Sequence, residues 1–191
     1  MNTRTALLNS AESAARQRGY DGFSYADLAQ EVGIRKASIH HYFPKKADLA
    51  LELLERYAAG FMDDLAEIDT ANSSAADKLR AYHTLYRDAL VDGTQLCLCV
   101  AFSAGRDSLP EPVLQRLNQF HADSITWLTR VLSIATDDGS VAGLTDAEAE
   151  AHATLALMEG AQLVARAANS AAPFDRATAA FIARLSAPNT H

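Results

Sequence analysis

Apolar residues recur every three or four positions along most of the chain, and short stretches of glycine, proline and small polar residues interrupt them. This spacing is typical of one face of an α-helix, whereas a half-buried strand would alternate at every second residue. Beyond the N-terminal region, the pattern predicts helices over residues 45–67, 76–91, 94–105, 111–135, 145–169 and 174–186. With three N-terminal helices, the chain is predicted to be all-α, with about nine helices and no internal repeat.

The three N-terminal helices have clear start and stop signals. They are expected over residues 3–18, 25–32 and 34–42. Ser24 is a favourable N-cap for the second helix, and Asp27 at the third helical position can complete a capping box. Gly33 should end that helix in a left-handed conformation, and Pro44 closes the third helix. A short helix, a tight glycine turn and a second short helix form the outline of a helix-turn-helix.

The charge balance changes sign near the end of this region. Residues 1–50 hold seven basic and five acidic side chains, whereas residues 51–191 hold ten and nineteen, and the whole chain has a net charge of -7. Contacts to phosphates need local positive charge, so only the N-terminal quarter suits nucleic acid. We therefore predict a small domain over residues 1–47 and a larger helical domain over residues 48–191.

Composition narrows the class of protein. Hydrophobic residues make up 49% and charged residues 21%, with 9 Gly and 5 Pro, as is typical of a helical globular protein. The first residues lack the apolar core of a signal peptide, and no stretch reaches the roughly 18 apolar residues of a membrane span, so we expect a cytoplasmic protein with no membrane partner. Cys97 and Cys99 are too few and too close together for a disulfide framework, and reduced thiols are expected.

The string FSYADLAQEVGIRKASIHHYFPKKADL, from Phe23 to Leu49, closely resembles the DNA-binding signature of the TetR (tetracycline repressor) family. This resemblance implies an all-helical homodimer that binds double-stranded, palindromic operator DNA. It also implies that a small-molecule inducer enters the larger domain and releases the DNA. On this reading, residues 1–47 bind DNA, and residues 48–191 bind ligand and dimerise.

The third helix has one face for packing and one for contact. Ile39 and Phe43 are four residues apart and can pack onto the second helix, which leaves the opposite face open to base edges. From these residues and from the family's contact positions, we predict DNA contacts by Ser24, Arg35, Lys36, Ala37, Ser38, His40, His41, Tyr42 and Lys46. Arg35 and His40 depart from the family, which often has Ser and Tyr there, so the operator cannot be taken from a relative. Lys45 is either a phosphate contact or simply solvated.

Several side chains of the larger domain suit either a ligand pocket or a hydrophobic core. The predicted pocket residues are Phe61, Tyr82, Tyr86, Cys97, Cys99, Phe102, Phe120, Trp127 and Met158. If both cysteines lie on one helix, they point about 200° apart and should not form a disulfide together. Each is either a small buried hydrophobe or a thiolate that reacts with an electrophile or oxidant, and no flanking charge lowers a thiol pKa.

The last two predicted helices carry faces rich in alanine and leucine, and in the family the corresponding pair meets its symmetry mate. The predicted interface comprises Leu155, Met158, Ala161, Gln162, Ala165, Phe174, Ala177 and Phe181. The predicted function is a TetR-type repressor released by a small molecule or an electrophile. The alternatives are an adaptor of the same fold without DNA binding, and an enzyme. No glycine-rich phosphate loop, nucleophile elbow or metal-binding His-Glu pair supports an enzyme, and we expect no metal or cofactor.

Overall fold

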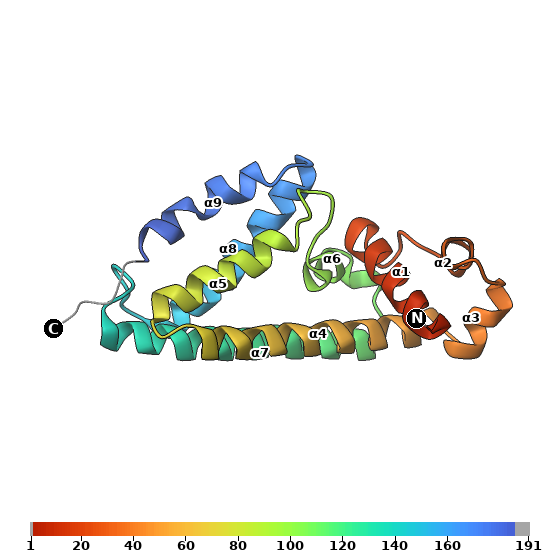
Figure 1. Cartoon of the computed structure of the whole chain (residues 1–191), viewed down its shortest axis with the longest axis horizontal. Coiled ribbons are helices and arrows are strands. Elements are labelled where there is room, and N and C mark those ends of the chain that lie inside the picture. The colour runs from red at the N-terminus through yellow and green to blue at the C-terminus, as the bar shows by residue number, and fades with distance from the viewer. Residues whose placement is uncertain (1, 186–191) are drawn as a thin grey trace. The chain divides into compact units, whose positions relative to one another are not determined.

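The computed structural model describes residues 2–185, and within that range it contains nine α-helices and one short 3-10 helix (Figure 1). The helices are α1 Thr3–Arg18, α2 Tyr25–Val32, α3 Lys36–Tyr42, α4 Lys46–Ala71, α5 Ala75–Asp88, α6 Leu98–Ala104, η1 Arg106–Ser108, α7 Glu111–Asp138, α8 Ala147–Ala167 and α9 Ala172–Ala183. The all-α prediction is confirmed. Position 186, the predicted end of the last helix, lies outside the described residues.

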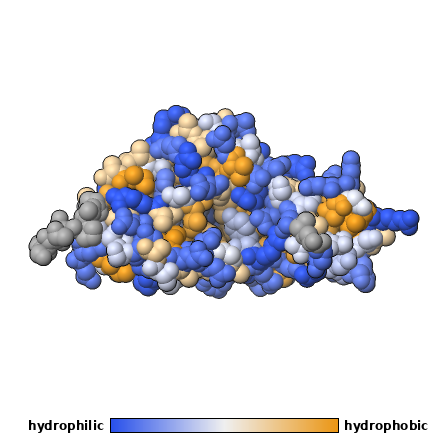
Figure 2. Space-filling view, viewed as in Figure 1, coloured by the Kyte–Doolittle hydropathy of each residue, from blue (hydrophilic) through white to orange (hydrophobic). Residues whose placement is uncertain are grey.

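The chain forms two compact units, which are described separately. The first comprises the residues up to Gly60 together with residues 95–120, and the second comprises residues 61–94 and those from His121 onward. The predicted functional division between residues 47 and 48 falls at the start of α4 and stays a prediction. No helix in residues 2–185 combines the length and apolar character needed to cross a bilayer. On the face drawn in Figure 2, hydrophobic residues form separate patches in a largely hydrophilic surface.

In the first unit, α1 packs against α2 and α6 through buried leucine and alanine side chains. The capping box of α2 forms as predicted: the Ser24 hydroxyl accepts from the Asp27 backbone N–H, and the Ser24 N–H donates to Asp27 Oδ2 at 2.7 Å. Gly33 is left-handed, with φ 76°. The Ile34 N–H then turns back to the carbonyl of Ala29, so α3 begins at Lys36, two residues later than predicted.

The helix α6 is much shorter than the predicted 94–105. The preceding segment does not form a helix because Leu96 is held to α1 instead. Its backbone N–H donates to the Arg16 carbonyl at 3.0 Å, and its carbonyl accepts from Arg16 Nε at 2.9 Å. Cys97 is therefore the N-cap of α6, with the non-helical angles φ -51° and ψ 139°, and only Cys99 lies within the helix.

The second unit is built from α5, α8 and α9, which pack on one another, and from the parts of α4 and α7 that lie beyond Gly60 and Phe120. A fully buried glutamine joins two of these helices: Gln162 Nε2 on α8 donates to the carbonyl of Tyr86 on α5 at 2.6 Å. An isolated bridge between Val141 and Leu185 ties the α7–α8 loop to the end of α9.

Candidate nucleic-acid interface

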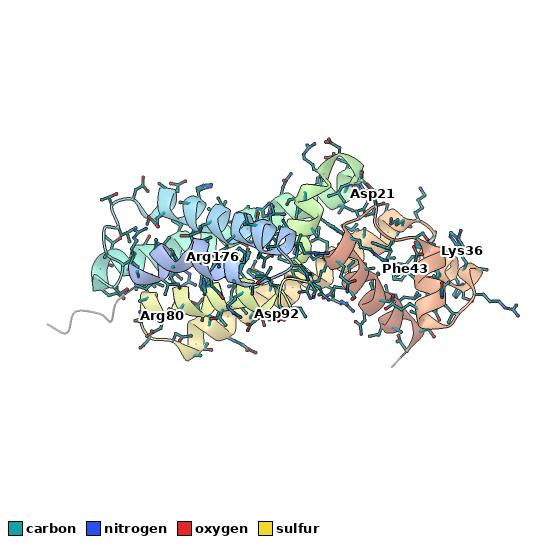
Figure 3. All side chains as sticks on the ribbon, turned by 90° about the horizontal axis from the view of Figure 1, so that it is seen from above. Asp21, Lys36, Phe43, Arg80, Asp92 and Arg176 are labelled. Carbon is teal, nitrogen blue, oxygen red and sulfur yellow. The ribbon has the colours of Figure 1, made fainter. Side chains whose placement is uncertain are left out.

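The helix α3 presents a continuous polar face around two buried anchors. Ile39 is 0% and Phe43 is 1% exposed, and both pack into the first unit. On α3 and at its N-cap, seven residues predicted to contact DNA are exposed: Arg35, Lys36, Ala37, Ser38, His40, His41 and Tyr42. Figure 3 shows Lys36 extending outward from α3, whereas Phe43 lies among the neighbouring helices. This arrangement leaves one side of a short helix available to enter a major groove.

A buried hydrogen bond fixes the end of α3 against α2. The Tyr25 hydroxyl donates to the Phe43 carbonyl at 2.9 Å. Burial and the nearby charge of Asp48 raise the pKa of Tyr25 to about 12, so the phenol remains a donor. The His40 ring meets the Tyr25 ring edge-on at 5.0 Å, and its Nδ1 lies 3.3 Å from the Pro44 carbonyl. These contacts hold an exposed imidazole in a defined position on the exposed side of α3.

A basic depression adjoins this face. It has a volume of about 340 Å³ and is lined by Phe23, Ser24, Tyr25, Lys36, His40, Pro44, Lys45 and Lys46. Ser24 stands at the N-terminus of α2, and two of the lining lysines, Lys36 and Lys45, are exposed. Ammonium groups near a helix N-terminus suit a phosphate oxygen, so the depression extends the candidate interface from bases to backbone.

The side chain of Lys46 has an internal role that the sequence did not indicate. Its Nζ donates to the carbonyls of Tyr20 at 2.5 Å and Phe23 at 2.6 Å, and it lies over both aromatic rings at 4.5 and 4.3 Å. Burial lowers the pKa of Lys46, against the raising effect of Asp21 and Asp27. Two of the three ammonium donors therefore hold the loop before α2, and the predicted phosphate contact has at most the remaining one.

The predicted ligand-pocket residues are divided between the two units. Four of them make a cluster of aromatic rings in the second unit: Tyr82 stacks on Trp127 at 5.4 Å, and Phe61 meets Tyr82 at 6.2 Å and Tyr86 at 5.9 Å. Met158, also in the second unit, is fully buried. The other predicted residues, Cys97, Cys99, Phe102 and Phe120, are buried in the first unit. The pocket remains a prediction, and the aromatic cluster is its best-defined part.

Seven of the eight residues predicted at the dimer interface are buried within a single chain. They are Leu155, Met158, Ala161, Gln162, Ala165, Phe174 and Phe181, and only Ala177 is exposed. These seven pack inside the second unit, and their place in a dimer interface stays a prediction. Leu163 and Val164 on α8 are 43% and 58% exposed and are available for such a contact.

The surroundings of the two cysteines correct one expectation and add a feature that the sequence did not indicate. The thiols do not diverge by 200°, because Cys97 precedes α6 and its side chain hydrogen-bonds that of Cys99. The pKa of Cys97 is lowered to about 7 despite burial, first by the Cys99 thiol and then by the Tyr57 hydroxyl and backbone N–H groups. Sequence reasoning missed Tyr57, because it lies 40 positions away and no local motif marks it.

Comparisons with known proteins agree with this architecture. Residues 7–53 match the family described as "Bacterial regulatory proteins, tetR family", and residues 65–181 match "Tetracyclin repressor-like, C-terminal domain". The HTH-type transcriptional repressor NemR of Escherichia coli K12 is 26% identical over 181 residues, which cover 93% of this chain and 91% of NemR. A TetR family regulator from Agrobacterium tumefaciens has a crystal structure similar to this one, with a TM-score of 0.91, 34% identity, and 97% and 98% of the two chains covered. The reduced form of E. coli NemR gives a TM-score of 0.82 over 99% of this chain and all of that one.

Proposed function

The chain belongs to the tetR family of bacterial regulatory proteins, and from this premise we propose that it is a transcriptional repressor that binds operator DNA through α2 and α3. The observation that carries the proposal is the exposed face of α3. Its seven predicted contact residues surround two anchors that are almost completely buried. A folded helix with so many polar and small side chains facing outward can approach base edges closely.

The proposal assigns bases and phosphates to different residues. Ala37, Ser38 and His40 lie in the middle of the exposed face and would reach base edges. Arg35, Lys36 and Lys45 would supply most of the positive charge that meets the phosphates, together with the Ser24 hydroxyl at the start of α2. This division follows from chemistry: small and hydrogen-bonding groups read sequence, and cations hold the backbone.

We further propose that the repressor acts as a homodimer on a palindromic operator in the cytoplasm and has no enzymatic activity. A two-fold symmetric dimer offers two copies of α3, and two half-sites one helical turn apart repeat the contact. Its sequence relative in E. coli is named a repressor, which supports repression rather than activation.

Release from DNA would follow from binding of a small molecule or an electrophile. The cluster of Phe61, Tyr82, Tyr86 and Trp127 suits a flat, apolar ligand, because such rings bind by stacking and by excluding water. A ligand acts only through its different affinity for the DNA-bound and released forms. A coupling of about 3 kcal/mol would weaken operator binding about 150-fold.

The test starts from a selection of bound sequences from random duplex DNA, followed by fluorescence anisotropy with the selected site and competitor DNA. A repressor should select a palindrome and bind it at least about 1000-fold more tightly than random DNA. Lys36→Ala should weaken binding, whereas the matched control Arg106→Ala, which removes an exposed cation on η1, should not. An adaptor or an enzyme would select no sequence at all, and that result would rule out the proposal.

A further inference from the structure

Two thiols and a phenol meet at the start of α6, within the first unit. Cys97 is 2% and Cys99 is 0% exposed, and both are present as thiols. Cys97 is the N-cap of α6 with φ -51° and ψ 139°, so its side chain leaves the helix start in a different direction from a helical residue. This geometry brings the Cys97 sulfur within hydrogen-bonding contact of the Cys99 side chain and of the Tyr57 hydroxyl on α4.

The surroundings favour the thiolate form of Cys97 over that of an ordinary thiol. Hydrogen bonds from Cys99 and Tyr57 outweigh the effect of burial and lower the pKa of Cys97 to about 7. Burial together with the two neighbouring sulfurs raises the pKa of Tyr57 well above its usual value, so its phenol stays protonated and donates. The backbone N–H groups of Cys99 and Val100 also favour the thiolate of Cys97.

The same segment is fastened to the DNA-binding helices. Leu96, next to Cys97, makes two hydrogen bonds with Arg16. The Leu96 N–H donates to the Arg16 carbonyl, and the Arg16 guanidinium donates to the Leu96 carbonyl. Arg16 lies in the last turn of α1, and α1 packs against both α2 and α6. A change in the backbone at Cys97 therefore acts directly on the helix that supports the recognition elements.

We propose that Cys97 and Cys99 form a reversible disulfide within one chain when a small hydroperoxide oxidises them, and that this bond alters the attachment of Leu96 to α1. The disulfide itself does not depend on the proposed function, but its effect on DNA does. The near-complete burial of both thiols favours a small oxidant over a bulky electrophile.

The reaction balances with the hydroperoxide as the two-electron oxidant. The Cys97 thiolate attacks the hydroperoxide, an S–O bond forms as the O–O bond breaks, and the alcohol leaves after taking up a proton. The Cys99 sulfur then attacks the Cys97 sulfenic acid, forming the S–S bond as the S–O bond breaks. Water leaves with the Cys99 proton. Two thiols are oxidised to a disulfide, and the hydroperoxide is reduced to an alcohol and water.

We expect closure of the bond to move the backbone at the start of α6. The sulfurs have to come from hydrogen-bonding contact to about 2.05 Å. Cys99 is inside α6, whereas Cys97 is its N-cap and joins the helix through one hydrogen bond, from the Ala101 N–H to the Cys97 carbonyl at 3.0 Å. The movement therefore falls on Cys97 and on the adjoining Leu96, whose two hydrogen bonds to Arg16 are the ones that should weaken.

The chemical test uses the full chain, treated with hydrogen peroxide and then alkylated and digested with trypsin. Peptide 88–106 contains both cysteines. It should lose two hydrogens, resist alkylation, and return to the dithiol form with a reducing agent. Cys97→Ala and Cys99→Ala should each abolish this product, and Tyr57→Phe should slow it about three- to tenfold. Thiols that stay unreacted, sulfinic acid without an S–S bond, or a disulfide between two chains would overturn the proposal.

A parallel measurement of operator binding separates the chemistry from the function. Oxidised wild type should bind the selected operator at least about tenfold more weakly than reduced wild type, and its affinity should recover after reduction. The affinity of a Cys97→Ala, Cys99→Ala double variant should not change on treatment with peroxide. A disulfide that leaves affinity within about twofold would overturn the coupling through Leu96 and Arg16. If reduced wild type selects no DNA, the proposed function fails, while the peptide result still decides whether the disulfide forms.

Discussion

At the scale of single residues, Lys36 and Lys46, which precede and follow Ile39 in the sequence, have different surroundings. The Lys36 ammonium is exposed, whereas that of Lys46 binds two carbonyls and lies over two rings. Lys36→Ala should weaken binding to all DNA sequences alike. The slope of log affinity against log salt concentration should become less steep by about one unit. Lys46→Met keeps the stem but loses the donors, so it should lower the free energy of unfolding by about 1 to 3 kcal/mol. Denaturant melts and salt titrations distinguish the two, and a fully stable Lys46→Met variant would contradict the internal role.

His40 is the residue whose loss should change sequence preference. Its ring is held against Tyr25 and faces outward from α3, so it can offer a nitrogen to a base edge. His40→Ala should relax discrimination at one base position of each half-site, by about 1 to 3 kcal/mol, and leave binding to random DNA nearly unchanged. Repeating the sequence selection with the variant measures this. An unaltered selected site would remove His40 from the set of base-reading residues.

The reactivity of Cys97 should follow its lowered pKa. Only the thiolate reacts, so the alkylation rate rises as the pH passes the pKa of the folded protein. With a pKa of about 7, the rate should be half-maximal near pH 7 rather than near the ordinary value of 9.0. Tyr57→Phe removes a hydrogen bond to the thiolate and should move this midpoint upward. Mass spectrometry of the peptide containing both cysteines measures the alkylation rate at each pH. A midpoint near pH 9 in wild type would show that Tyr57 and Cys99 do not stabilise the thiolate.

At the scale of secondary-structure elements, local signals were sufficient for the first helices. The bounds of α1 and α2 agree with those expected from the sequence, because Ser24, Asp27 and Gly33 act on backbone groups within a few residues. The same local chemistry identified the exposed and buried sides of α3, where Ile39 and Phe43 repeat at four-residue spacing. The all-α class and the exposed side of α3 were therefore predictable.

Long-range hydrogen bonds explain what was not predictable. The apolar run around Cys97 has helical spacing, but Arg16, some 80 positions earlier, takes up the backbone groups of Leu96. The sequence alone indicates that Lys46 is a DNA-binding cation. In the structure, however, its ammonium donates to the carbonyls of Tyr20 and Phe23. In both cases a distant backbone group competes with the local preference, and periodicity carries no information about it.

A carboxylate connects three helices of the second unit. Asp69 on α4 accepts from Lys78 on α5 and from Trp127 and Arg130 on α7. Burial alone would raise the pKa of Asp69, but the hydrogen bonds from Lys78 and Trp127 and the charge of Arg130 lower it. Stabilisation from a lowered carboxyl pKa is present above the ordinary pKa and is lost as the pH falls through the folded value.

Asp69→Asn should therefore lower the free energy of unfolding by about 1 to 3 kcal/mol at neutral pH, and the difference from wild type should shrink in acid. Asp63→Asn is the matched control, because Asp63 is exposed on the same helix and should change stability by less than about 0.5 kcal/mol. Urea titrations at several pH values measure both. Equal stability of the Asp69 variant and wild type at neutral pH would show that this carboxylate does not hold the helices together.

At the scale of the whole molecule, the predicted dimer needs a surface that one chain does not already bury. The outer side of α8 offers one: Ala153, Ala156, Gly160, Leu163 and Val164 are all exposed. A Cβ added at Gly160 would meet nothing within 4 Å in the single chain. Small residues permit two helices to approach closely, and exposed leucine and valine supply apolar area. We therefore expect the two-fold contact on this side of α8.

Val164→Glu tests that expectation without disturbing the core, because Val164 is 58% exposed in the single chain. A carboxylate placed against its own symmetry mate would be desolvated and repelled, so the dimer should dissociate at concentrations where wild type stays intact. Operator binding should fall with it, since separated chains lose the second half-site contact that linkage makes nearly intramolecular. Helical content should change little, and Thr84→Glu, on the exposed side of α5, should leave both dimer and binding unaltered. Sedimentation velocity and anisotropy on the same samples give the two readouts. A wild-type monomer, or a Val164→Glu dimer that binds its operator as wild type does, would place the two-fold contact elsewhere on the chain.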